Sequence, residues 1–167
     1  GVLPRLLDMG IEPFLIASTV NTIIGQRLVR RIAENNESYQ ADNVETEAIL
    51  DTIGTLLPAK AEDVTKVSED LGYKNLPLGG QKAYTLHRGK DTSQAPGGYK
   101  GRMGLYEVID VNGEIEDLIL KRATSSEIQD KAKEQGMITM REDGYLKAVS
   151  GLTTIEEVNR VTAVDSA

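Results

Sequence analysis

The hydrophobic positions near the start of the chain recur at helical spacing. The first run ends at Gly10, a residue type that commonly terminates a helix, and Pro13 then suits the first turn of a second helix. The apolar pattern of this second helix continues to Gly25. Residues 26–32 (QRLVRRI) either continue the helix or form a strand, and we favour a strand. The polar stretch 33–40 is turn-like and predicts a boundary.

The middle of the chain switches between helical and strand patterns. Asp42 and Glu45 have the spacing of a capping pair, so we expect a helix that begins there and stops just before Pro58. The segments that follow are predicted as a shorter helix over 62–71, a loop over 72–82, a half-buried strand over 83–88, a long turn over 89–101 and a strand over 102–111.

Helical patterns fill the remainder of the chain. Three threonines each precede a glutamate by three residues, which is the spacing of a capping box. These pairs are Thr124 with Glu127, Thr139 with Glu142, and Thr153 with Glu156. They predict three or four short helices packed as a bundle. The expected fold class is therefore α+β and predominantly helical, with short strands and a C-terminal bundle of short helices.

Charge and composition narrow the class of protein. The 167 residues carry a formal net charge of −7, which disfavours a nucleic-acid partner. Cysteine is missing, which excludes disulfides and thiolate metal sites. No apolar run reaches the roughly 18 residues that a membrane span needs, so no membrane insertion is expected. Gly1 stands inside an apolar helical pattern with no Met before it, and we expect the chain to be cut from a longer protein.

Sequence motifs for catalysis are also missing. No G-x-x-x-x-G-K-[ST] loop is present to hold the phosphates of a nucleotide. The single histidine, His87, is predicted on the outward face of a strand, so it supports no nucleophilic dyad. The 26 carboxylates are spread over helix caps and solvated helix faces. We therefore expect a non-catalytic part of a larger soluble machine.

Two segments carry unusual chemistry. Residues 97–104 (GGYKGRMG) hold four glycines and two cations, which indicates either a glycine-rich turn with solvated cations or a close approach of the backbone. The other segment places Arg27, Arg30 and Arg31 near the expected boundary. These arginines fit a solvated edge strand or a surface that pairs with a carboxylate or phosphate, and the sequence leaves both open.

The order of several motifs resembles one protein family. Residues 5–16 and 25–30 are followed by GYKGRMGLYEV at 98–108, and then by GMITM, DG and GLTTIEEV between 136 and 158. This series resembles the type II secretion and type IV pilus assembly ATPases over nearly the whole chain, with 33–96 as the divergent part. The resemblance divides the chain into 1–32 as the tail of the ATPase core, 33–100 as an insertion, and 101–167 as a C-terminal strand and helical subdomain.

Membership in that family would imply a hexameric motor on the cytoplasmic face of the bacterial inner membrane. Such motors use ATP and Mg²⁺ to assemble pilin or pseudopilin fibres through an inner-membrane platform protein. The resemblance places the catalytic boxes upstream of Gly1, so the chain is expected to be inactive alone, to hold no cofactor, and to meet other subunits and the platform protein. The alternative is a stand-alone acidic α+β protein-interaction module with no nucleotide role.

The resemblance also assigns two kinds of site. It implies that Arg102 lies near the nucleotide of the motor. It further implies a four-cysteine zinc site in many members, and the four corresponding positions here are Ala33, Asn36, Asp91 and Gln94. This set cannot supply a structural zinc site, so no zinc is expected.

Overall fold

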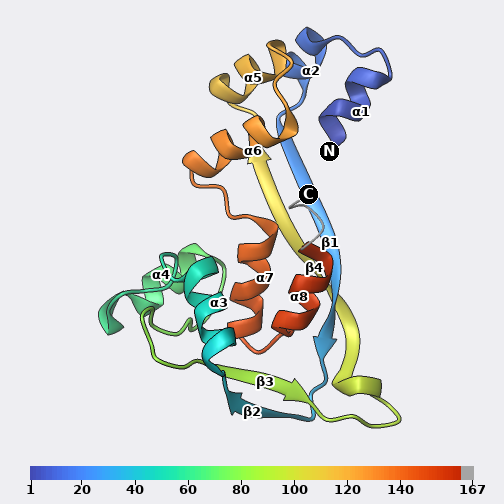
Figure 1. Cartoon of the computed structure of the whole chain (residues 1–167). Helices are drawn as coiled ribbons and strands as arrows, with labels where there is room; N and C mark the ends of the chain where they lie inside the picture. The colour runs from blue at the N-terminus through green and yellow to red at the C-terminus, as the bar shows by residue number, and fades with distance from the viewer. Residues whose placement is uncertain (163–167) are drawn as a thin grey trace. The chain divides into compact units, whose positions relative to one another are not determined.

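The computed structural model describes residues 1–162, which divide into two compact units (Figure 1). The first unit consists of Gly1–Gln26 and Tyr106–Thr139, and the second of Arg27–Leu105 with the chain from Met140 onward. Two long strands, β1 (Thr22–Ile32) and β4 (Tyr99–Asp110), pair with each other and contribute residues to both units.

The first unit is built mainly from four helices. They are α1 (Val2–Asp8), α2 (Pro13–Thr19), α5 (Gly113–Leu120) and α6 (Ser125–Glu134). Helix α2 packs against α5, and α5 packs against α6. Their shared core is aliphatic: Leu3, Ile16, Ala17, Ile115, Ile119, Ile128 and Ala132. The predicted capping box of Thr124 and Glu127 is confirmed at the start of α6.

The second unit combines helices with a short two-stranded antiparallel sheet. Its helices are α3 (Asn43–Ile53), α4 (Val64–Asp70), α7 (Met140–Val149) and α8 (Ile155–Thr162), with single 3₁₀ turns at Ala61–Asp63 and Pro96–Gly98. Helix α7 packs against both α3 and α8. Its largest fully buried side chains include Tyr84, Tyr145, Ile49, Ile53 and Leu105. The capping box of Asp42 and Glu45 is confirmed at α3.

Strands β2 (Asn36–Gln40) and β3 (Thr85–Gly89) form the second sheet. They run antiparallel, with Asn36 opposite Gly89 and Tyr39 opposite Leu86. The alternation predicted for 83–88 is confirmed, because Leu86 is buried while Thr85 is exposed. This register brings the two ends of the divergent segment together, since Asn36 follows β1 and Gly89 leads toward β4.

Two sequence predictions about elements are wrong between residues 13 and 40. The helix that begins at Pro13 ends at Thr19 rather than near Gly25, and β1 begins at Thr22. The β-branched run of Thr22 and its two following isoleucines favours a strand, and burial along β1 alternates as a strand requires. The stretch 33–40, predicted as a turn, contains β2.

The predicted single bundle of C-terminal helices is also wrong. The mixed α+β class is confirmed, with eight α-helices and four strands among residues 1–162. However, α5 and α6 belong to the first unit, whereas α7 and α8 belong to the second. The reason is that Ile115 and Ile128 find their apolar partners on α1 and α2, while Leu146 and Val158 find theirs within the second unit. These units join segments from different parts of the 1–32, 33–100 and 101–167 division.

Candidate functional site

Glu157 is a buried carboxylate that forms hydrogen bonds with two arginines. It lies in the first turn of α8, and its side chain is only 2% exposed. Arg30 of β1 donates from Nε and Nη2 to Oε1 at 3.1 and 2.7 Å, and its main-chain N–H donates to Oε2 at 2.9 Å. Arg160 donates to both oxygens, at 3.2 and 2.9 Å. The carboxylate thus accepts five hydrogen bonds, and the three from Arg30 join β1 to α8.

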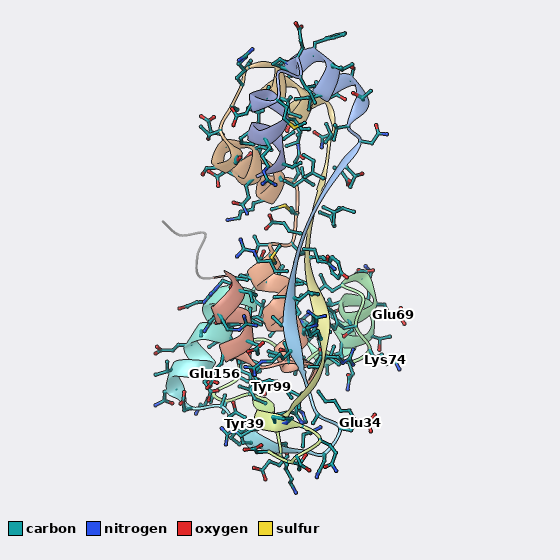
Figure 2. All side chains as sticks on the ribbon, turned by 90° about the vertical axis from the view of Figure 1, so that its right-hand side faces the viewer. Glu34, Tyr39, Glu69, Lys74, Tyr99 and Glu156 are labelled. Carbon is teal, nitrogen blue, oxygen red and sulfur yellow. The ribbon has the colours of Figure 1, made fainter. Side chains whose placement is uncertain are left out.

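Two neighbouring threonines complete this cluster. Thr154 caps α8, because its Oγ1 accepts from the main-chain N–H of Glu157 at 3.2 Å. Thr153 is buried and donates its hydroxyl to the carbonyl of Arg30 at 2.8 Å. The hydroxyl of Tyr99, a residue that Figure 2 labels, lies 2.8 Å from Thr154 Oγ1. The Arg30 guanidinium stacks 4.2 Å from the centre of the Tyr99 ring.

The predicted capping box of Thr153 and Glu156 is therefore wrong by one residue. Glu156 is exposed, and the cap residue is Thr154. Both threonines and both glutamates satisfy the local pattern, so the sequence could not choose between them. Arg30 selects Glu157 over Glu156, because the side chain and the main-chain N–H of Arg30 both donate to the Glu157 carboxylate.

The two arginines determine the protonation of Glu157. Burial by itself raises the pKa of this carboxyl, but the hydrogen bonds from Arg160 and Arg30 outweigh burial. The net pKa is lowered from 4.5 to about 2. The pKa of Arg30 is raised by the same hydrogen bond to Glu157. The cluster is consequently ionised at neutral pH, with two cations on one anion. The side chains of Arg30 and Arg160 both reach solvent, at 52% and 56% exposure.

The three arginines singled out in β1 have three different environments. Arg27 donates to the carbonyl of Val161 at the end of α8. Arg30 pairs with Glu157, which is the carboxylate pairing that the sequence left open. Arg31 is exposed and runs alongside Gly101. The structure brings the first two to α8 and leaves the third beside the segment 89–101.

The glycine-rich segment makes the close backbone approach that the sequence offered as one of its two interpretations. Gly97, Gly98 and Gly101 all have positive φ, at 68°, 85° and 79°. Gly98 is buried against Gly89 of β3, and a Cβ on either residue would overlap the other's backbone. Arg102, in contrast, has an exposed side chain on β4.

The four positions that correspond to the family's cysteines lie around this glycine contact. Asn36 Nδ2 donates to the carbonyls of Ala33 and Glu34, at 2.9 and 3.0 Å, and its Oδ1 lies 3.3 Å from His87 Nδ1. Asp91 Oδ1 accepts from a main-chain N–H at 3.0 Å. The side chains of these two positions therefore crosslink the segment by hydrogen bonds.

A zinc ion does not fit these residues. Ala33 has no donor atom, and the amide oxygen of Asn36 faces His87. Among residues 1–162, no group of three or more His, Cys, Asp or Glu side chains could hold a metal ion. Hydrogen bonds and the close packing of Gly89 against Gly98 hold this segment together.

Elemental analysis tests this account of the four positions. Because the donor set lacks thiolates, we expect the purified chain to contain less than about 0.1 zinc per chain after dialysis, since structural zinc sites bind with free energies of about 10–16 kcal/mol and survive such treatment. One retained zinc per chain would contradict the account.

Asn36→Ala should destabilise the second unit by about 1–2 kcal/mol, because it removes the hydrogen bonds that Asn36 Nδ2 donates to two main-chain carbonyls.

Sequence reasoning missed the centre of this cluster. Tyr99 lies in the glycine-rich segment and Glu157 in the GLTTIEEV motif, but the sequence predicted no role for either of them or for Arg160. Within the described residues, no helix is long and apolar enough to cross a membrane.

Comparison with known proteins assigns the chain to a family. Residues 1–160 match the family described as Type II/IV secretion system protein. The Type II secretion system protein E of Xanthomonas campestris is 39% identical over 97% of this chain, and the Type IV pilus assembly ATPase PilB of Pseudomonas aeruginosa is 32% identical over 96%. PilB of Thermus thermophilus is 34% identical over 92%. The chain spans 24%, 24% and 15% of these relatives' lengths. The chain therefore belongs to the type II/IV secretion system protein family.

Proposed function

We propose that this chain is the C-terminal part of a hexameric motor ATPase that powers pilin or pseudopilin fibre assembly. The observation that carries the proposal is the family match over residues 1–160, together with relatives that are named pilus assembly ATPases. The chain spans 24% and 15% of the length of these two relatives, which agrees with a role as one part of the motor. ATP and Mg²⁺ would be bound by the longer protein, at the cytoplasmic face of the inner membrane.

In this proposal the chain mediates contacts between subunits and with the inner-membrane platform protein. Exposed apolar side chains on the first unit support such contacts, because large exposed apolar groups commonly mark interaction surfaces. Met9 is 75% exposed, Phe14 70% and Ile24 64%. Arg27 and Arg30 would support these contacts indirectly, because they hold β1 against α8, while Arg31 remains available to a partner.

Arg102 is proposed to lie at the edge of the nucleotide site in the motor. Its exposed side chain on β4 leaves the guanidinium available to an incoming phosphate or base. The neighbouring glycines fix the path of the strand at this point, since Gly101 adopts a φ of 79°.

ATP hydrolysis by the chain and by the longer protein tests the proposal. We expect the 167-residue chain to show only background hydrolysis, because it has no loop to hold the phosphates. The longer protein should hydrolyse ATP, and Arg102→Ala in it should reduce kcat/KM by about tenfold or more, equivalent to about 1.4 kcal/mol. Lys121→Gln, at an exposed position on the first unit, is the charge-matched control.

Two outcomes would contradict the proposal. Turnover by the chain alone would show that it is an enzyme in its own right. A gene that encodes no nucleotide-binding loop upstream of Gly1 would favour the stand-alone interaction module. Unchanged kinetics in Arg102→Ala would remove only the assignment of that arginine.

A further inference from the structure

A cleft of about 510 Å³ lies where β1 ends and β4 begins, in the second unit. Three cations line it, and each comes from a different segment: Arg31 from β1, Lys90 from the loop after β3, and Lys100 from β4. Glu34 is the single carboxylate in the lining, and Figure 2 labels it in this part of the chain. The cleft therefore carries a net charge of +2 in a chain whose total is −7.

Main-chain hydrogen bonds hold the walls of this cleft together. Ala33 donates to the carbonyl of Gly98 at 2.9 Å, and Lys90 donates to the carbonyl of Asn35 at 2.9 Å. The small side chains of Ala33 and Ala95, both buried, leave the space between the walls open. The three segments meet at the lower end of the second unit in Figure 1. The cations thus line a cleft whose walls are joined by main-chain hydrogen bonds.

None of the three cations forms an ion pair within residues 1–162. In this they differ from six cations elsewhere in the described chain, each of which has a carboxylate partner: Lys60 with Glu62, Lys66 with Asp70, Lys131 with Glu134, Lys147 with Asp143, and Arg30 and Arg160 with Glu157. Convergent like charges without partners repel one another, and a bound anion would relieve that repulsion.

We propose that this cleft binds a small phosphate-bearing anion. A phosphate group accepts donors from several directions at once, which suits cations that approach from three chain segments. Arg31 supplies a planar fork of donors, and the two lysines supply mobile point charges. Gln94 and Thr92 line the same cleft and add neutral donors. The net charge of +2 matches a dianion. This proposal does not depend on the proposed motor function.

Calorimetric titration of the chain with pyrophosphate, in a phosphate-free buffer of low ionic strength, tests the assignment. We expect saturable 1:1 binding, whose Kd rises at least tenfold in the double variant Lys90→Gln/Lys100→Gln. The binding should also weaken as salt is added, because these cations are exposed. Circular dichroism spectra should be the same for both proteins, because both substitutions are at exposed positions.

The matched control is the double variant Lys74→Gln/Lys82→Gln. Both lysines are exposed in the second unit and lie outside the cleft, and Figure 2 labels Lys74. The control makes the same change in net charge, and we expect its Kd to stay within twofold of the wild-type value. Equal weakening in both double variants would overturn the site, as would an absence of binding. Citrate should bind at least fivefold more weakly than pyrophosphate; equal affinity would overturn the phosphate assignment.

Discussion

Gly98→Ala should destabilise the second unit by about 2–5 kcal/mol. One part of this cost is conformational, because Gly98 has a φ of 85° and an L-residue pays about 1–2 kcal/mol there. The other part is steric. A Cβ on Gly98 would lie 2.5 Å from the carbonyl carbon of Gly89 and nearer still to its oxygen. Backbone cannot move aside as a side chain can, so we add about 1–3 kcal/mol for forced overpacking.

Gly97→Ala separates these two contributions. Gly97 has a similar φ of 68°, but it is exposed, and a Cβ there meets only the Tyr99 ring at 3.7 Å. We expect the control to lose about 1–2 kcal/mol, from backbone strain alone. Urea denaturation followed by tyrosine fluorescence provides the measurement. Five of the six tyrosines, Tyr39, Tyr73, Tyr84, Tyr99 and Tyr145, belong to the second unit. Equal losses in the two variants would contradict the close approach of Gly98 to Gly89.

Glu157→Gln should destabilise the second unit by about 2–4 kcal/mol at pH 7. The substitution keeps the shape of the side chain but removes the negative charge that faces two guanidinium groups. An amide NH₂ also cannot accept the hydrogen bonds that one carboxylate oxygen now receives. We place the loss below the upper limit for broken buried pairs, because the side chains of Arg30 and Arg160 are about half exposed and can regain water.

Glu156→Gln is the matched control, one residue away on the same helix. Glu156 is exposed and labelled in Figure 2, so we expect a loss within about 0.5 kcal/mol, as for ordinary surface substitutions. The same urea titration measures both variants. A larger loss in Glu156→Gln than in Glu157→Gln would restore the capping box of Thr153 with Glu156 and contradict the cluster around Glu157.

Acid titration gives a second measurement of the same carboxylate. The pKa of Glu157 is about 2 in the folded chain, below its ordinary value of 4.5. A lowered carboxyl pKa means that its stabilisation is fully present above pH 4.5 and is lost as the pH falls toward 2. The difference in stability between wild type and Glu157→Gln should therefore shrink over that interval. A difference that stays constant from pH 5 to pH 2 would show that the charge of Glu157 contributes nothing.

The buried cluster also connects the local stability of the chain with its proposed role. Arg30 joins β1 to α8 through Glu157, and Arg27 joins the same two elements through the carbonyl of Val161. Residues on β1 that face outward, such as Arg31, are positioned by these two inward contacts. In the proposed motor, loss of Glu157 would therefore disturb a partner surface that Glu157 itself does not touch.

Local chemistry in the sequence was sufficient to predict most element types and several of their ends. The pairs Asp42 with Glu45 and Thr124 with Glu127 were found from spacing alone, because a capping box depends on residues three positions apart. The motif order from residue 5 to 158 was sufficient for the family, which the match over residues 1–160 confirmed. The absence of cysteine was sufficient to exclude thiolate metal ligands.

Where local spacing fits two residues equally well, the tertiary structure decided between them. TTIEE contains two possible caps and two possible carboxylates, and only the position of Arg30 on a strand more than 120 residues away selects Thr154 and Glu157. The distribution of α5 to α8 between two units depends on which apolar surfaces they bury. The cleft of Arg31, Lys90 and Lys100 likewise exists only where three segments converge. Capping and periodicity act over three or four residues, whereas burial and charge pairing act between residues distant in sequence, and those are fixed only when the chain is folded.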